Sequence, residues 1–92
     1  RLGFDDVFAL RVKGDSMIDA GILDGDIAVI KKRPHADNND IVAALLDNNE
    51  VTLKRLRSKA GKFHLEAANT NYPPIFEEFK VIGKLITVIR KY

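Results

Sequence analysis

Short apolar stretches recur about every ten residues along this chain, and turn-forming residues separate them. No long stretch shows the helical spacing of apolar side chains, so we expect strands and no long helix. The segments that read as strands are residues 8–13, 26–32, 40–46, 50–56, 62–67 and 84–91. Gly, Pro and Asn residues lie between them, as is typical of turns. The pattern therefore predicts a mostly β fold, a compact small β-sandwich or partly closed barrel.

Two connections between these segments have recognisable local signals. Residues 17–22 are expected to form one short helical turn, with Asp15 or Ser16 near its N-terminus. Asp47-Asn48-Asn49 lies between two apolar runs and predicts a tight hairpin, because Asn tolerates a positive φ.

The length of 92 residues predicts a single domain. A chain this short buries only about 60–65% of its unfolded surface, so oligomerisation would help to stabilise it. With 46% apolar and 30% charged residues, its composition is that of a globular protein. The chain has no Cys, which excludes disulfides, thiolate catalysis and Cys-based zinc sites and fits a reducing cytoplasm.

Charge and hydropathy narrow the partners that this chain is expected to have. Fifteen basic residues nearly balance thirteen acidic ones, and the densest basic run, Lys31 to Arg33, is better explained as a solvated strand end than as a nucleic-acid contact. No apolar stretch approaches the ~20 residues that span a bilayer, and none resembles a signal peptide. The chain begins at Arg1 without an initiator methionine, so we expect it to be a fragment of a longer protein.

The serine in Gly14-Asp15-Ser16-Met17 is the first candidate for chemistry. A lone serine in a turn is usually only a turn residue. Here, however, Gly14 allows close approach of the backbone, and N–H groups at the start of a helical turn can stabilise an oxyanion. We expect the backbone of Met17 to supply such a group.

A nucleophilic serine needs a base, and three side chains are candidates. His35 follows a proline in a polar loop and His64 lies in an alternating strand, and neither has an acidic partner that the sequence can identify. Lys54 lies in Val51-Thr52-Leu53-Lys54-Arg55-Leu56, where a lysine could face the interior. The simpler interpretation of the strand pattern alone is a solvated lysine like Lys62.

Lys54 could act as a base only if its amine were neutral at working pH. A free lysine has a pKa near ~10.4, and burial can lower it by ~3–5 units. Lowering it by ~3 units costs about 4 kcal/mol, which a small fold can bear at one functional site.

Metal sites have weaker support. Asp37-Asn38-Asn39-Asp40 is rich in oxygen ligands, but it lacks the Gly and the later Glu of a calcium loop. Asp24-Gly25-Asp26 is interpreted as a turn that leads into the next strand. We expect no metal and no cofactor.

Four motifs together resemble the C-terminal domain of LexA-type repressors, over residues 8–91. They are Gly14-Asp15-Ser16-Met17, Asp24-Gly25-Asp26, Asp40-Ile41-Val42-Ala43 and Val51-Thr52-Leu53-Lys54-Arg55-Leu56, and the resemblance ends with Val88-Ile89-Arg90-Lys91. Gly-Asp-Ser-Met alone would be a weak signal, but its combination with Val-Thr-x-Lys is specific. Members of this family are Ser-Lys self-cleaving proteins with the fold shared by LexA and signal peptidases.

The resemblance implies that Ser16 is the nucleophile and Lys54 the general base. The family cleaves its own chain, typically at an Ala-Gly bond well before the serine, and only 15 residues precede Ser16 here. Ala20-Gly21 and Ala60-Gly61 follow the serine and are interpreted as turns. Residues 1–92 are therefore expected to be one C-terminal autoprotease and dimerisation domain, without the cleavage segment or the N-terminal DNA-binding domain.

The family also implies partners. We expect a homodimer, cleavage promoted by the RecA filament on single-stranded DNA, operator binding only through the N-terminal domain, and a place in the bacterial cytoplasm without a membrane. An unpaired apolar strand near the chain end would favour aggregation, so the dimer interface is predicted there. The predicted interface residues are Leu85, Ile86, Thr87, Val88 and Ile89.

Several alternatives stay open at this point. The run around Ser16 is also close to UmuD-type polymerase accessory proteins, and phage repressors share the domain. A non-catalytic dimerisation module would keep the same fold. A signal peptidase shares the Ser-Lys chemistry, but Asp19 stands where its usual Ser-Met-x-Pro pattern has proline.

Overall fold

A computed structural model describes residues 6–91 of the chain as a mostly β domain. Its strands are β1 (Val7–Arg11), β2 (Ile27–Lys32), β3 (Ile41–Leu46), β4 (Val51–Lys59), β5 (Lys62–Glu66) and β6 (Phe79–Ile89). One short 3-10 helix, η2 (Ile18–Ala20), follows the candidate nucleophile. The predicted fold class and the single helical turn are confirmed.

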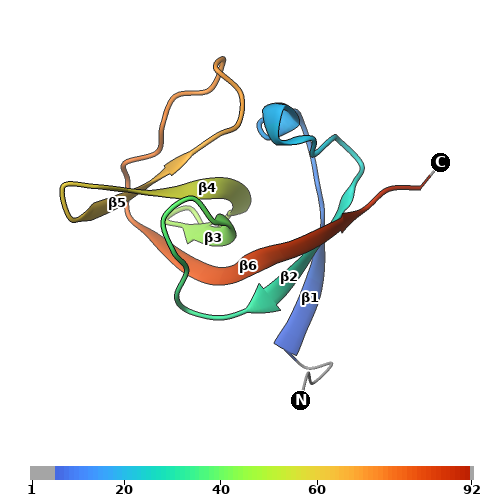
Figure 1. The fold of residues 1–92 in the computed structure, drawn as a ribbon, viewed down its shortest axis with the longest axis horizontal. Coiled ribbons are helices and arrows are strands. Elements are labelled where there is room, and N and C mark those ends of the chain that lie inside the picture. The colour runs from blue at the N-terminus through green and yellow to red at the C-terminus, as the bar shows by residue number, and fades with distance from the viewer. Residues whose placement is uncertain (1–5, 92) are drawn as a thin grey trace.

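The strands form one antiparallel sheet of order β1-β2-β6-β3-β4-β5, with the last strand of the chain in the middle. The first part of β6 pairs with β3, and its second part pairs with β2. Figure 1 shows β6 running the length of the sheet and joining the β1–β2 pair to the β3–β5 strands. Because both halves share β6, a partly closed barrel describes the sheet better than two separate layers.

A glycine allows β6 to change partners. A Cβ atom on Gly83 would lie 2.3 Å from the Ile30 side chain and 2.6 Å from the Lys31 carbonyl oxygen. Such distances are far below van der Waals contact, so only glycine fits where β6 passes β2. The predicted strand 84–91 begins five residues too late and ends two residues beyond β6. β6 starts at Phe79 and continues through Gly83.

The other predicted strands agree with the structure to within two residues, except that β4 extends to Lys59. The predicted hairpin between β3 and β4 is confirmed. Asn49 has a φ of 67°, and its N–H donates to the Leu46 carbonyl at 3.0 Å. Ala60 and Gly61 turn β4 into β5 with positive φ values, as their interpretation as a turn required.

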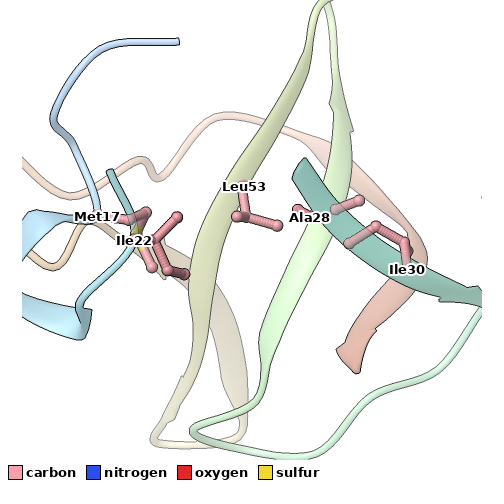
Figure 2. Packing of buried hydrophobic residues seen from close by; sticks show 6 residues of the cluster. Met17, Ile22, Ala28, Ile30 and Leu53 are labelled. Carbon is pink, nitrogen blue, oxygen red and sulfur yellow. The ribbon is translucent and has the colours of Figure 1, made fainter. Parts of the chain in front are cut away.

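The buried side chains form two clusters, and β3 contributes to both. Ile41 and Ala43 face the first cluster, whereas Val42 and Ala44 face the second, because side chains alternate along a strand. This double burial explains why β3 is apolar at every position. The first cluster contains Met17, Ile22, Ala28, Ile30, Ala43 and Leu53. Figure 2 shows Met17 and Ile22 side by side, with Leu53 of β4 between them and the β2 side chains.

Candidate functional site

Ser16 lies in a turn that hydrogen bonds hold from the N-terminal side. Gly14 has a φ of +80°, which a residue with a side chain rarely adopts, and its N–H donates to Asp24 Oδ1 at 2.7 Å. The Gly25 N–H donates to the Val12 carbonyl at 2.8 Å. These hydrogen bonds join the segments before and after Ser16, and Asp24 stabilises the turn that carries the serine.

Apolar side chains anchor the same turn from the C-terminal side. Met17 and Ile22 are each only 2% exposed and pack into the first cluster. Gly21 ends η2 in the left-handed conformation, and its N–H donates to the Ile18 carbonyl. Met17 occupies the N-cap without a side-chain cap, so core packing fixes this short helix more than capping does.

Lys54 reaches Ser16 from β4. Its Nζ lies 3.1 Å from Ser16 Oγ, and the residue is only 8% exposed. Nζ also donates to Thr52 Oγ1 and, at 3.2 Å, to the Leu53 carbonyl. Burial lowers the pKa of Lys54 from its usual value, because desolvation disfavours the ammonium form. The structure thus brings together the serine and the lysine that the sequence singled out.

This arrangement can carry out one kind of chemistry. When the Lys54 amine is neutral, its lone pair can accept the hydroxyl proton of Ser16, which makes the serine oxygen a nucleophile. Thr52 lies two residues before Lys54 on the same strand face and accepts a hydrogen bond that fixes the amine. The alternation of side chains along the strand, which places Thr52 and Lys54 on one face, was the signal in the sequence that could have identified Thr52.

The backbone near Ser16 has free donors. Within residues 6–91, the N–H groups of Asp15, Ser16 and Met17 make no hydrogen bond. Met17 was the expected contributor to an oxyanion hole, and the geometry leaves its N–H available for that role.

Asp26 is a residue whose importance the sequence did not show. It is 2% exposed and accepts two hydrogen bonds from Arg90, at 2.8 and 2.7 Å, and one from the Leu23 N–H at 2.7 Å. The Arg90 hydrogen bonds, and then that of Leu23, lower the pKa of Asp26 to about 2. Arg90 also donates to the Gly21 carbonyl, so the residue after β6 braces the turn that carries Ser16.

A groove of roughly 320 Å³ opens beside the Ser16–Lys54 pair. It is lined by Leu10, Arg11, Val12, Lys13, Ser16, Met17, Ala28, Val51, Thr52, Leu53 and Lys54. The two histidines do not line it. His35 borders a different hollow, and the His64 ring pairs with Glu66 at 2.7 Å. Glu66 is an acidic partner that the sequence had not revealed, but the pair lies outside this groove.

The predicted interface strand is half paired. Leu85 and residues 87–89 pair with β2 on one edge, with a bulge at Ile86, whereas the β3 partners on the other edge stop at Lys84. Ile86 and Ile89 are 55% and 57% exposed, but Leu85 and Val88 pack against the first cluster. The described part of the chain thus presents two exposed isoleucines on a strand with an open edge.

Residues 6–91 hold neither a cluster of metal-ligating side chains nor a membrane-spanning helix. No three His, Cys, Asp or Glu side chains lie close enough to hold a metal ion. None of the helices there is long and apolar enough to cross a membrane.

Comparison with known proteins gives the family. A family model described as Peptidase S24-like matches residues 3–86. The LexA repressor of Gluconobacter oxydans (strain 621H) is 50% identical over 94 residues, covering 99% of this chain and 40% of the relative. That of Clostridium kluyveri (strain ATCC 8527) is 50% identical over 88 residues, covering 95% of this chain and 43% of the relative. The chain therefore spans about two fifths of the length of these curated relatives. The resemblance to LexA-type repressors is confirmed, and the chain belongs to the Peptidase S24-like family.

Proposed function

We propose that this domain is the self-cleaving serine peptidase of a LexA-type transcriptional repressor, with Ser16 as nucleophile and Lys54 as general base. The observation that supports it best is the buried Lys54 Nζ at 3.1 Å from Ser16 Oγ. The LexA repressors at 50% identity support the same assignment. The substrate is a segment of the same protein that precedes the residues described here.

The proposed reaction runs in two steps. Ser16 Oγ attacks the scissile carbonyl carbon while its proton passes to the neutral Lys54 amine. The resulting ammonium gives the proton to the leaving amine as the peptide bond breaks. Water then attacks the acyl-serine ester, and Lys54 takes the water proton and returns it to Ser16 Oγ. Backbone N–H groups at Ser16 and Met17 stabilise the oxyanion in both steps.

The groove beside the pair suits an extended peptide. It is lined by the backbone and side chains that run from Leu10 to Lys13 on one side and from Val51 to Lys54 on the other. Seating a peptide there would exclude water from Lys54 and lower its pKa further. Docking and activation of the base are therefore one event.

The domain also dimerises the repressor through Leu85, Ile86, Thr87, Val88 and Ile89 in this proposal. The exposed isoleucines and the open edge of β6 favour an isologous contact between two copies. The repressor would act in the bacterial cytoplasm, bind operator DNA through a separate N-terminal domain and be cleaved when a RecA filament on single-stranded DNA stabilises the docked state. A UmuD-like or phage-repressor role is the alternative with the same chemistry, and a non-catalytic dimerisation module is the alternative without it.

The test uses the full-length protein. Ser16→Ala and Lys54→Ala should each abolish self-cleavage, because nucleophile and base act as one unit. Self-cleavage is measured by electrophoresis of samples taken over time at mildly alkaline pH. Ser58→Ala and Lys62→Ala, which change an exposed serine and an exposed lysine on β4 and β5, should cleave at the parent rate. Cleavage of the Ser16→Ala protein at the parent rate would refute the assignment, and a folded but inactive parent would favour the dimerisation module.

A further inference from the structure

The loop between β5 and β6 forms hydrogen bonds with the nucleophile turn (residues 14–26). The pairing of the sheet strands does not require these contacts. A bridge between Leu65 and Ile75 closes the base of this loop, with hydrogen bonds of 3.1 and 2.8 Å. Residues 67–74 above the bridge, here called the clamp loop, stand beside η2 on the same side of the sheet (Figure 1). The loop is thus held at its base and meets the turn at its tip.

Four hydrogen bonds join the clamp loop to the residues on both sides of Ser16. Before the serine, Asn69 Nδ2 donates to the Asp15 carbonyl at 2.9 Å, and the Tyr72 hydroxyl donates to Asp15 Oδ1 at 2.6 Å. After it, the Ala68 N–H donates to Met17 Sδ at 3.3 Å, and the Asp19 N–H donates to the Ala68 carbonyl at 2.8 Å. Within residues 6–91 the Ser16 side chain itself bonds only to Lys54, so the clamp loop acts on its neighbours.

The contact at the Asp15 carbonyl is the most informative one. The Asp15–Ser16 peptide is planar, so fixing its carbonyl also fixes the direction of the Ser16 N–H on the opposite side. Asn69 is itself oriented, because its Oδ1 accepts from the Asn71 N–H at 2.9 Å and leaves Nδ2 to donate. Because the Ile18 N–H also donates to the Asp15 carbonyl, at 3.2 Å, the clamp loop and the start of η2 together set the plane of the Asp15–Ser16 peptide.

Tyr72 holds the same residue through its side chain. The hydrogen bond to Asp15, together with the charge of that carboxylate, raises the pKa of Tyr72, so its hydroxyl keeps its proton and remains a donor. Tyr72 is exposed and Asn69 is partly buried, and neither belongs to the buried clusters. Both side chains instead donate hydrogen bonds to Asp15 in the nucleophile turn.

We propose that the clamp loop positions the nucleophile, with Asn69 and Tyr72 as positioning residues that act on Ser16 through Asp15. This inference rests on the proposed function, because it assumes that Ser16 is the nucleophile. It predicts that loss of either contact lowers the reactivity of Ser16 without changing the base. Lys54 lies on β4 and makes none of these four contacts.

The experiment measures how fast a fluorophosphonate modifies Ser16 in the 92-residue chain, followed by intact mass. In that reaction Ser16 Oγ bonds to phosphorus, fluoride leaves, and the serine proton passes to Lys54. Tyr72→Phe, which removes only the hydroxyl, should slow labelling about threefold to tenfold, and Asn69→Ala about tenfold. Thr70→Ala, an exposed position of the same loop, is the matched control and should label at the parent rate. Asp15→Asn keeps an acceptor for Tyr72 and should label faster than Asp15→Ala.

The pH profile separates positioning from an effect on the base. In Tyr72→Phe the plateau rate should fall while the pH midpoint set by Lys54 stays at the parent value, and the melting temperature should change little. Parent-like labelling of both Tyr72→Phe and Asn69→Ala would overturn the inference, as would a shifted midpoint or an equal loss in Thr70→Ala. Failure of the proposed function looks different: the parent chain would then not be labelled at Ser16, or Lys54→Met would be labelled as fast as the parent.

Discussion

The nucleophile turn and the end of β6 differ in backbone regularity and in the burial of their side chains. Residues 14–26 have irregular backbone, yet Met17, Ile22 and Asp26 in this turn are each 2% exposed. Residues 85–89 lie in a strand with a bulge at Ile86, and Ile86 and Ile89 are more than half exposed. An irregular segment stays in one conformation only when buried side chains hold it, whereas a strand with exposed apolar side chains and an open edge remains free to bind a partner.

The two regions also meet, because Arg90 follows β6 and hydrogen-bonds to Asp26 and to the Gly21 carbonyl in the turn. The strand proposed for dimerisation and the turn proposed for catalysis are therefore joined by one guanidinium. The following predictions test how far the regions can be separated, from the largest expected effect to the smallest.

The pH dependence of self-cleavage tests the buried region, where Lys54 lies beside Ser16. The neutral fraction of Lys54 grows about tenfold per pH unit below its pKa, so the rate in full-length protein should rise on that slope and then level off. Because burial lowers the pKa of Lys54, levelling should begin below the usual lysine value of ~10.4. Cleavage rates without any partner, from about pH 6 to pH 10, measure this. A bell centred near ~6.5 would instead indicate a histidine base, His35 or His64.

A charged side chain at the end of β6 tests the exposed region, which is the proposed dimer interface. Ile86→Lys should weaken dimerisation at least tenfold while leaving the fold intact, because Ile86 is 55% exposed. Val88→Lys should also unfold the domain, since Val88 packs against the first cluster and an unpaired charge would be buried there. Sedimentation equilibrium and thermal melting report the two effects separately. A parent chain that stays monomeric at high micromolar concentration would exclude this interface.

The Asp26–Arg90 contact tests the link between the regions, with a smaller effect. The folded pKa of Asp26 is about 2, below its unfolded value of 3.8, so this contact stabilises the fold above the unfolded pKa. The contribution should disappear as pH falls from about 4 towards 2. Asp26→Asn should therefore lower the urea midpoint at neutral pH and make its pH dependence shallower in that acid range. A variant whose midpoint follows the parent at every pH would show that the pair adds no stability.

Much of the site was predictable because its chemistry is carried by residue types at definite positions. Ser16 and Lys54 come from motifs that only a few families combine, and Lys54 lies in a segment whose alternation predicted a strand. Asn69, Tyr72 and Arg90 could not be predicted in this way. They act through hydrogen bonds to Asp15, Gly21 and Asp26, and no local pattern links residues so far apart in the chain.

The sequence by itself determined the mostly β class and the turns at Asn49 and Gly61, because strand alternation and turn propensity act over a few residues. It indicated the serine–lysine pair through the resemblance to LexA-type repressors. Only the tertiary structure decided that β6 lies in the middle of the sheet, with Gly83 against Ile30 and Lys31. It also decided that Lys54 is buried beside Ser16 and thereby loses affinity for its proton. The physical reason is that burial and strand order depend on the packing of distant segments, which local preference does not specify.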